Sequence, residues 1–228
     1  MQKLIRRLFT SAAIAVAVLA PQVHASIAVA VVDFDSPGLT GLYFSGDSFT
    51  QSGFTMTASF DAGIVDTAAA LGGAAPSGNA TRFYSGLNDG GLVMQRTDGG
   101  LFDLKSFDAA FIPLDPAASG TTVMVAFGTY ADNTASGVAW LFGSKSGGAF
   151  PFVNYSDPAD FAGFSRLKQV EFFACAFDGV NVCAAPTFNN GQFAIDNITA
   201  NKIPEPSTTA MLSLCLLGLA LFSRRSAR

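Results

Sequence analysis

Turn-forming residues are spaced along the middle of this 228-residue chain as in a β-protein rather than a helical one. Gly, Pro, Asn and Asp recur at short intervals, and β-branched and aromatic residues fill the stretches between them. No stretch of 26–203 keeps a 3.6-residue apolar period over three turns, whereas Phe54, Met56, Ala58 and Phe60 alternate with polar residues. Short strands are expected at 27–34, 54–60, 81–84, 92–96, 107–112, 122–127, 138–142, 149–155, 167–177 and 192–199. This pattern predicts an all-β sandwich or barrel.

Turn signals divide these expected strands. The Asn-Asp-Gly-Gly of 88–91 is echoed by the Thr-Asp-Gly-Gly of 97–100, which predicts two turns that bracket one strand. The segment 63–79 is rich in Ala and Gly and contains Pro76, so we expect a loop with at most one short helix there.

The first 25 residues have the three parts of a secretory signal peptide. A basic start is followed by an apolar run over 8–20, and Val23 and Ala25 supply the small residues that signal peptidase accepts. Cleavage is expected after Ala25. The alternative, a signal helix that stays in the membrane, is less favoured because the run is short for a span of about 20 residues.

The last 25 residues, 204–228, form a second sorting device. Pro204, Glu205 and Pro206 precede an apolar run over 210–222, and Arg224, Arg225 and Arg228 close the chain. Arginines that follow an apolar span stay on the cytoplasmic side, so this end predicts a short transmembrane helix that agrees with an exported middle. The span is short, as expected of a temporary inner-membrane anchor; a plain C-terminal anchor after a Pro-rich linker is the alternative.

This C-terminus resembles the PEP-CTERM sorting signal, in which the same three features occur in the same order. The resemblance implies a Gram-negative bacterium with an exosortase, a membrane enzyme that recognises Pro204, Glu205 and Pro206 and releases or transfers the protein. It also implies an envelope, surface or extracellular-matrix location, since such proteins accompany genes for extracellular polysaccharide.

The exported domain, 26–203, is strongly acidic. It holds seven basic residues against sixteen acidic ones, a net charge near −9. Such a domain lacks the basic surface that nucleic-acid binding needs. The only histidine, His24, leaves with the signal peptide. The mature domain therefore has no imidazole for a Ser-His-Asp triad, a Cys-His pair or a usual zinc site.

Two cysteines lie close together in this domain. Cys175 and Cys183 flank the turn signal Asp178-Gly179, and disulfides persist in an exported protein. We predict a Cys175–Cys183 disulfide across a hairpin, with two free thiols as the alternative.

The two ends of the domain resemble the first and last strands of jelly-roll domains of the carbohydrate-binding and galactose-binding-like group. The residues that carry this resemblance are 32–35 and 193–198. It implies a jelly-roll-like antiparallel β-sandwich, and a structural calcium ion held by Asp33, Asp35 and Asp196. The alternative is that Asp196 caps a turn or pairs with a basic residue, and that Asp33 and Asp35 face solvent.

Sugar binding would need exposed flat aromatic rings. Trp140, Tyr130 and Tyr155 are the candidate ligand-binding residues, with Tyr43 and Tyr84. A buried Trp140 is the favoured alternative, and most of the 22 phenylalanines are expected to fill the core.

These features favour a non-enzymatic surface or matrix protein that associates with extracellular polysaccharide. No Gly-x-Ser-x-Gly motif occurs. A purely structural envelope protein is one alternative, and a carboxylate-dependent glycoside hydrolase is a more distant one.

Overall fold

The computed structural model describes residues 27–113, 122–176 and 191–204, and this part of the chain is nearly all β. One short helix, α2 (Ala68–Leu71), and two 3-10 turns, η1 (Pro37–Leu39) and η2 (Gly72–Ala74), accompany the strands. The strands are β1 (Ala28–Val32), β2 (Gly41–Phe44), β3 (Ser48–Gln51), β4 (Phe54–Ser59), β5 (Ala62–Asp66), β6 (Phe83–Leu87), β7 (Gly91–Arg96), β8 (Phe102–Phe111), β9 (Thr122–Tyr130), β10 (Ala135–Leu141), β11 (Val153–Tyr155), β12 (Leu167–Ala176) and β13 (Phe193–Lys202). The all-β prediction is confirmed.

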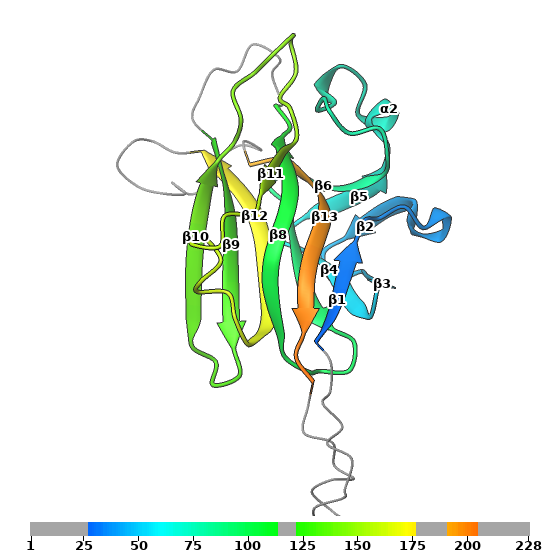
Figure 1. Ribbon diagram of the computed structural model, residues 1–228. Helices are drawn as coiled ribbons and strands as arrows, with labels where there is room; N and C mark the ends of the chain where they lie inside the picture. Colours follow the sequence, from blue (N-terminus) through cyan, green and yellow to red (C-terminus); the bar gives the residue numbers. More distant parts are fainter. Residues whose placement is uncertain (1–26, 114–121, 177–190, 205–228) are drawn as a thin grey trace, which may run out of the picture.

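The pairings arrange these strands as two antiparallel layers (Figure 1). The first layer runs β2-β5-β6-β13-β8, with β11 on the far side of β8 and β1 alongside the C-terminal half of β13. The second layer runs β3-β4-β7-β12-β9-β10. A single paired position, Leu167 with Phe102, joins β12 to β8 and links the layers into one nearly closed sheet. This arrangement is the expected jelly-roll-like sandwich.

Strand alternation explains the core. In β4, Phe54, Met56 and Ala58 are buried while the intervening residues are half-buried, as the sequence pattern predicts. The core centres on Phe107 of β8, whose ring centroid lies 5.1 Å from that of Trp140 and 5.4 Å from that of Phe172. Each such buried ring stabilises the fold by about 1.5–3 kcal/mol.

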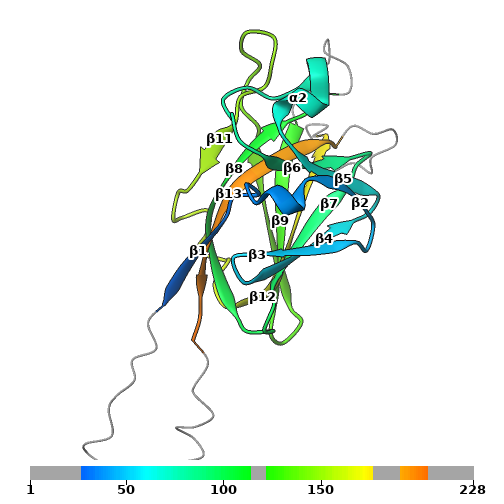
Figure 2. The same cartoon turned by 90° about the vertical axis from the view of Figure 1, so that its right-hand side faces the viewer.

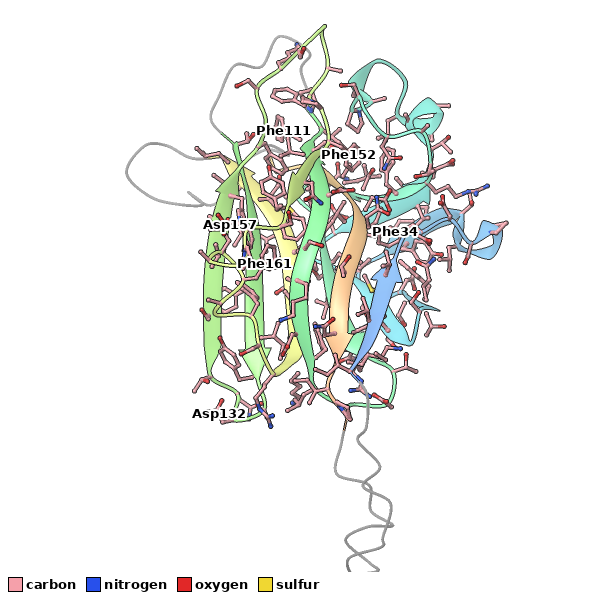
Figure 3. The ribbon with its side chains drawn as sticks, viewed as in Figure 1. Phe34, Phe111, Asp132, Phe152, Asp157 and Phe161 are labelled. Atoms are coloured by element: carbon pink, nitrogen blue, oxygen red, sulfur yellow. The ribbon has the colours of Figure 1, made fainter. Side chains whose placement is uncertain are left out.

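The first and last strands of the domain pair with each other. β1 runs antiparallel to β13 from Ala28 opposite Lys202 to Val32 opposite Ile198. β1 therefore begins and β13 ends at the same end of the domain (Figure 2). Phe34, just past β1, has a φ of +54° and a fully buried ring (Figure 3).

Three strands were not expected from the sequence. β5 occupies the start of the segment 63–79, which was predicted to be a loop, although α2 is the single short helix allowed there. β2 and β3 are four residues each and are joined around Gly46, so neither is long enough to show clear alternation. The prediction that β7 lies between two turns is confirmed.

Candidate functional site

One carboxyl group is buried on the outer side of the first layer. Asp196 of β13 is 0% exposed, and it points away from the core that its neighbour Ile195 enters. Its Oδ2 accepts hydrogen bonds from Asn79 Nδ2 (2.6 Å) and Thr81 Oγ1 (3.3 Å). Its Oδ1 accepts one from the backbone N–H of Asn197 (2.8 Å). Asp196 thus holds the segment that follows η2 against the sheet.

Burial raises the pKa of Asp196 from 3.8 to about 7. The hydrogen bonds from Asn79, from the Asn197 N–H and from Thr81 oppose this rise, because they favour the charged form. The nearby carboxylate of Asp35 raises the pKa further by charge repulsion. Near neutral pH this group therefore exchanges between a carboxylic acid and a carboxylate.

The structure brings Asp35 toward Asp196 but gives Asp33 a different role. Asp33 Oδ1 accepts hydrogen bonds from Gln51 Nε2 (2.6 Å) and from the backbone N–H of Asp35 (3.2 Å). Asp35 Oδ1 accepts one from the backbone N–H of Arg82 (3.1 Å).

These contacts bear on the expected calcium ion. Two donors already occupy Asp196 Oδ2, and the described residues contain no group of three His, Cys, Asp or Glu side chains that could hold a metal. The contacts of Asp196 fit a hydrogen-bonded carboxyl group rather than a calcium ligand. Calcium at Asp33, Asp35 and Asp196 is not tested by these contacts and stays a prediction of the resemblance.

The candidate sugar-binding aromatics lie inside the sandwich. Trp140 is 6% exposed, its Nε1 donates to Asp160 Oδ2 (2.9 Å), and its ring stacks on Phe161 at 5.4 Å. Phe161 belongs to the segment between β11 and β12, and this segment covers Trp140 of β10 (Figure 3). Tyr155 is also buried and donates to the Leu141 carbonyl (2.8 Å), and the half-buried Tyr130 donates to the carbonyl of Gly163. Trp140 and Tyr155 therefore pack the core and offer no exposed ring, which corrects the hypothesis that they form a sugar-stacking platform.

The sorting and disulfide residues fall mostly outside the described residues. Pro204 lies two residues past the end of β13, and Arg96 Nη1 donates to the carbonyl of Ile203 beside it (2.6 Å). The other predicted sorting residues lie outside the described part of the chain: Glu205, Pro206, Arg224 and Arg225. Cys175 is buried in β12, but Cys183 also lies outside, so the disulfide between them stays a prediction.

The outer side of the second layer carries exposed phenylalanine rings that lie over glycines. Phe127 of β9 is 45% exposed and faces Gly137 of β10, where a Cβ would lie 2.9 Å from the Phe127 ring. Phe60, just after β4, is 62% exposed, and a Cβ on Gly91 would lie 3.0 Å from its ring. The glycines leave room for both rings to lie close to the sheet.

Phe60 is held in an unusual backbone conformation. Its φ of +64° is in the left-handed region, which costs a bulky L-residue about 1–2 kcal/mol. Its ring makes an edge contact with Phe173 of β12 at a centroid distance of 5.8 Å. The turn thus fixes an exposed ring in one place beside the sheet.

A single carboxylate lies among these rings. Glu171 of β12 is opposite Phe127 on one side and Val93 of β7 on the other. It is half-buried and has no hydrogen-bond or ion-pair partner among the described residues. Gln169 and Gln95 are paired across β12 and β7 in the next row, and within the described ranges their side chains have no hydrogen-bond partner either.

We call this surface the aromatic face and define it by Phe60, Phe127, Phe173, Glu171, Gln169 and Gln95. Exposed aromatic rings can stack on a flat apolar surface of a ligand. The free carboxylate and amides beside them can accept and donate hydrogen bonds around that surface.

Sequence reasoning did not find the aromatic face. The sequence pattern assigned most phenylalanines to the core, and it does not show that Phe127 and Phe60 lie over glycines of neighbouring strands. Glycine within a strand often marks close approach of another group, so Gly91 and Gly137 were the available signal.

Residues 202–225 match the family model of the PEP-CTERM protein-sorting motif. This confirms the resemblance drawn from the C-terminal residues. The motif marks an exported protein whose C-terminal tail is processed by an exosortase. Within the described ranges, no helix is long and apolar enough to cross a membrane.

The domain is similar in fold to a DUF4465 family protein from Bacteroides caccae. The TM-score is 0.52 at 13% identity, over 77% of this chain and 100% of that one. Two more distant neighbours come from Clostridium thermocellum. A family 22 carbohydrate-binding module has a TM-score of 0.33 at 13% identity, over 77% of this chain and 94% of its own. A family 11 carbohydrate-binding module, in complex with a β-1,3-1,4-mixed-linked tetrasaccharide, has a TM-score of 0.31 at 12% identity, over 80% and 100%.

The first of these likenesses shows the fold alone, and the other two are too distant to carry an argument about ligands. Comparison with curated proteins finds no match.

Proposed function

We propose that this exported protein is a non-enzymatic component of the surface or extracellular matrix of a Gram-negative bacterium, and that it binds extracellular polysaccharide through the aromatic face. The PEP-CTERM motif supports the location, because such a tail is processed by an exosortase at the inner membrane. The aromatic face supports the binding role.

One observation carries the proposal: rings of Phe60 and Phe127 are held open to solvent over Gly91 and Gly137. Exposed large apolar side chains in a group mark interaction sites more often than scattered ones do. The positive φ of Phe60 is a local cost that the fold retains, which is typical of functional positions. Sugars present flat faces of C–H groups ringed by hydroxyls, and the aromatic face offers complementary rings and hydrogen-bonding groups.

The alternatives make different demands on this surface. A glycoside hydrolase needs two carboxyl groups about 5–9.5 Å apart across the sugar. On the described part of the aromatic face Glu171 is the one charged side chain, which favours binding over hydrolysis. A purely structural envelope protein would not bind polysaccharide, so affinity measurements separate it from the proposed function.

Affinity measurements on the processed, exported protein would test this function. Binding to the producing organism's extracellular polysaccharide would be measured by titration calorimetry for the wild type, Phe60→Asn and Phe127→Ser. Asn suits the left-handed backbone of residue 60. We expect each variant to bind about tenfold or more weakly, since one aromatic stacking contact contributes on the order of 1–3 kcal/mol.

A matched control is available on the other layer. Phe44 of β2 is 59% exposed but lies away from the aromatic face, so Phe44→Ser should bind like the wild type. Equal loss in all three variants, or no binding by folded wild-type protein, would show that the aromatic face is not a glycan site.

A further inference from the structure

We infer that the aromatic face selects uncharged polysaccharide and rejects anionic polymers, with Glu171 as the residue that sets this specificity. This rests on the proposed function and names the class of ligand for the same site. The inference comes from where the charges of the domain lie.

In the part of the chain that the structure describes, the aromatic face carries no positive charge. Among the described residues, the side chains that face outward from the paired parts of β3, β4, β7, β9, β10 and β12 include one charged group, Glu171. The nearest basic residue along β12 is Lys168, which lies at the register shift where β12 begins. Its Nζ donates to Asn133 Oδ1 (3.5 Å) in the turn after β9. Arg96, at the end of β7, donates to Asp98, Leu101 and Ile203. An acidic polymer on this face would therefore meet a carboxylate and no cation.

The position of Glu171 places its carboxylate beside both ring positions. Phe127 is its direct cross-strand neighbour, so their Cβ atoms lie about 4.5–5.5 Å apart. Phe173 is two residues along the same strand, about 6.5 Å away. A sugar stacked on either ring would present hydroxyl groups to the carboxylate, which accepts at both oxygens.

Glu171 has acceptor oxygens to which no described residue donates a hydrogen bond, so a ligand can donate to them. A half-buried carboxylate loses part of its hydration and normally gains a donor in return. No donor reaches Glu171 among the residues that the structure describes. Hydroxyl donors of an uncharged sugar would fill that role, and hydrogen bonds to a charged acceptor are the stronger kind.

The test uses the processed protein and two classes of probe. A soluble β-glucan, a galactan and a dextran represent uncharged polymers, and alginate represents an anionic one. Wild-type protein is expected to bind at least one uncharged probe at least tenfold more tightly than alginate. Glu171→Gln keeps the shape but removes the charge, so binding to the uncharged probe should fall about five- to tenfold. Glu171→Lys should gain alginate binding that weakens as salt is raised.

Asp132→Asn is the charge-matched control, because Asp132 lies in the turn after β9 and its role as an acceptor for Thr134 survives in Asn (Figure 3). It should leave both affinities unchanged. A wild type that prefers alginate, or a Glu171→Gln variant with unaltered affinities, would overturn the specificity while leaving polysaccharide binding intact. A failure of the proposed function itself would give a different result: folded wild-type protein would bind none of the four polymers.

Discussion

The buried carboxyl group of Asp196 should make the stability of this domain depend on pH in an unusual direction. Most carboxylates have a lowered pKa in the folded state and lose their contribution in acid. Asp196 has a folded pKa of about 7 against 3.8 in the unfolded chain. Between these values the folded state holds a proton that the unfolded state has lost, so the free energy of unfolding falls as pH rises.

The size of the effect follows from the pKa difference. Each unit of difference corresponds to about 1.4 kcal/mol, so this group alone should lower the free energy of unfolding by about 4 kcal/mol as pH rises from about 4 to 7. Above pH 7 its contribution becomes flat. Asp196→Asn carries no charge at any pH and should remove this slope, although one donor of the pocket will face the new Nδ2 and cost about 1 kcal/mol.

Urea unfolding of the processed protein at about pH 4.5, 6, 7 and 8 would measure this. The difference between wild type and Asp196→Asn isolates the group from other carboxylates, and the two stability curves should cross as pH rises. Asp157→Asn is the control, because this exposed side chain accepts from the backbone N–H of Ala159, a role that Asn can keep. Parallel curves for wild type and Asp196→Asn would refute the account of Asp196 as a buried, proton-exchanging group.

Three further predictions concern single groups. Tyr84→Phe should lower the free energy of unfolding by about 1–2 kcal/mol in urea melts, because the buried Tyr84 hydroxyl donates to the Gly91 carbonyl (2.8 Å); an unchanged midpoint would contradict that bond. Chelation of calcium tests the predicted calcium site: a fall of several degrees in the thermal midpoint that Asp196→Asn abolishes would confirm it, and a midpoint unchanged within about 1 °C would show that the donors on Asp196 Oδ2 exclude the ion. Gly137→Ala should displace the Phe127 ring and weaken polysaccharide binding several-fold. The free energy of unfolding should change by about 0.5 kcal/mol or less, because that ring is exposed. Unweakened binding by this variant would show that the position of the Phe127 ring does not matter for recognition.

The strand pattern was readable from sequence because one face of most strands is buried. β4 and β7 alternate cleanly, and turn residues mark the ends of β7. β2 and β3 escaped because four residues give too little alternation, and β5 because Ala62 and Gly63 look like loop composition. Local pattern therefore predicted the fold class but not the full strand count.

The candidate site was harder to predict because exposure is decided by tertiary neighbours. Trp140 is covered by Phe161 from a later segment, and no local pattern announces that contact. The sequence singled out Asp196 as a calcium ligand, but it could not show the hydrogen bonds from Asn79 and Thr81, which lie more than a hundred residues earlier. Phe60 and Phe127 differ from the core phenylalanines only in what faces them across the sheet.

The pairing of β1 with β13 also sets the order of events during export. Ala28 meets Lys202, so the sheet is incomplete until nearly the whole domain has crossed the membrane. Contacts of such long sequence separation form slowly, because a large loop must close before they stabilise anything. During that interval the backbone edge of β1 lacks its partner strand. The domain therefore completes its sheet only after its last described strand has reached its first.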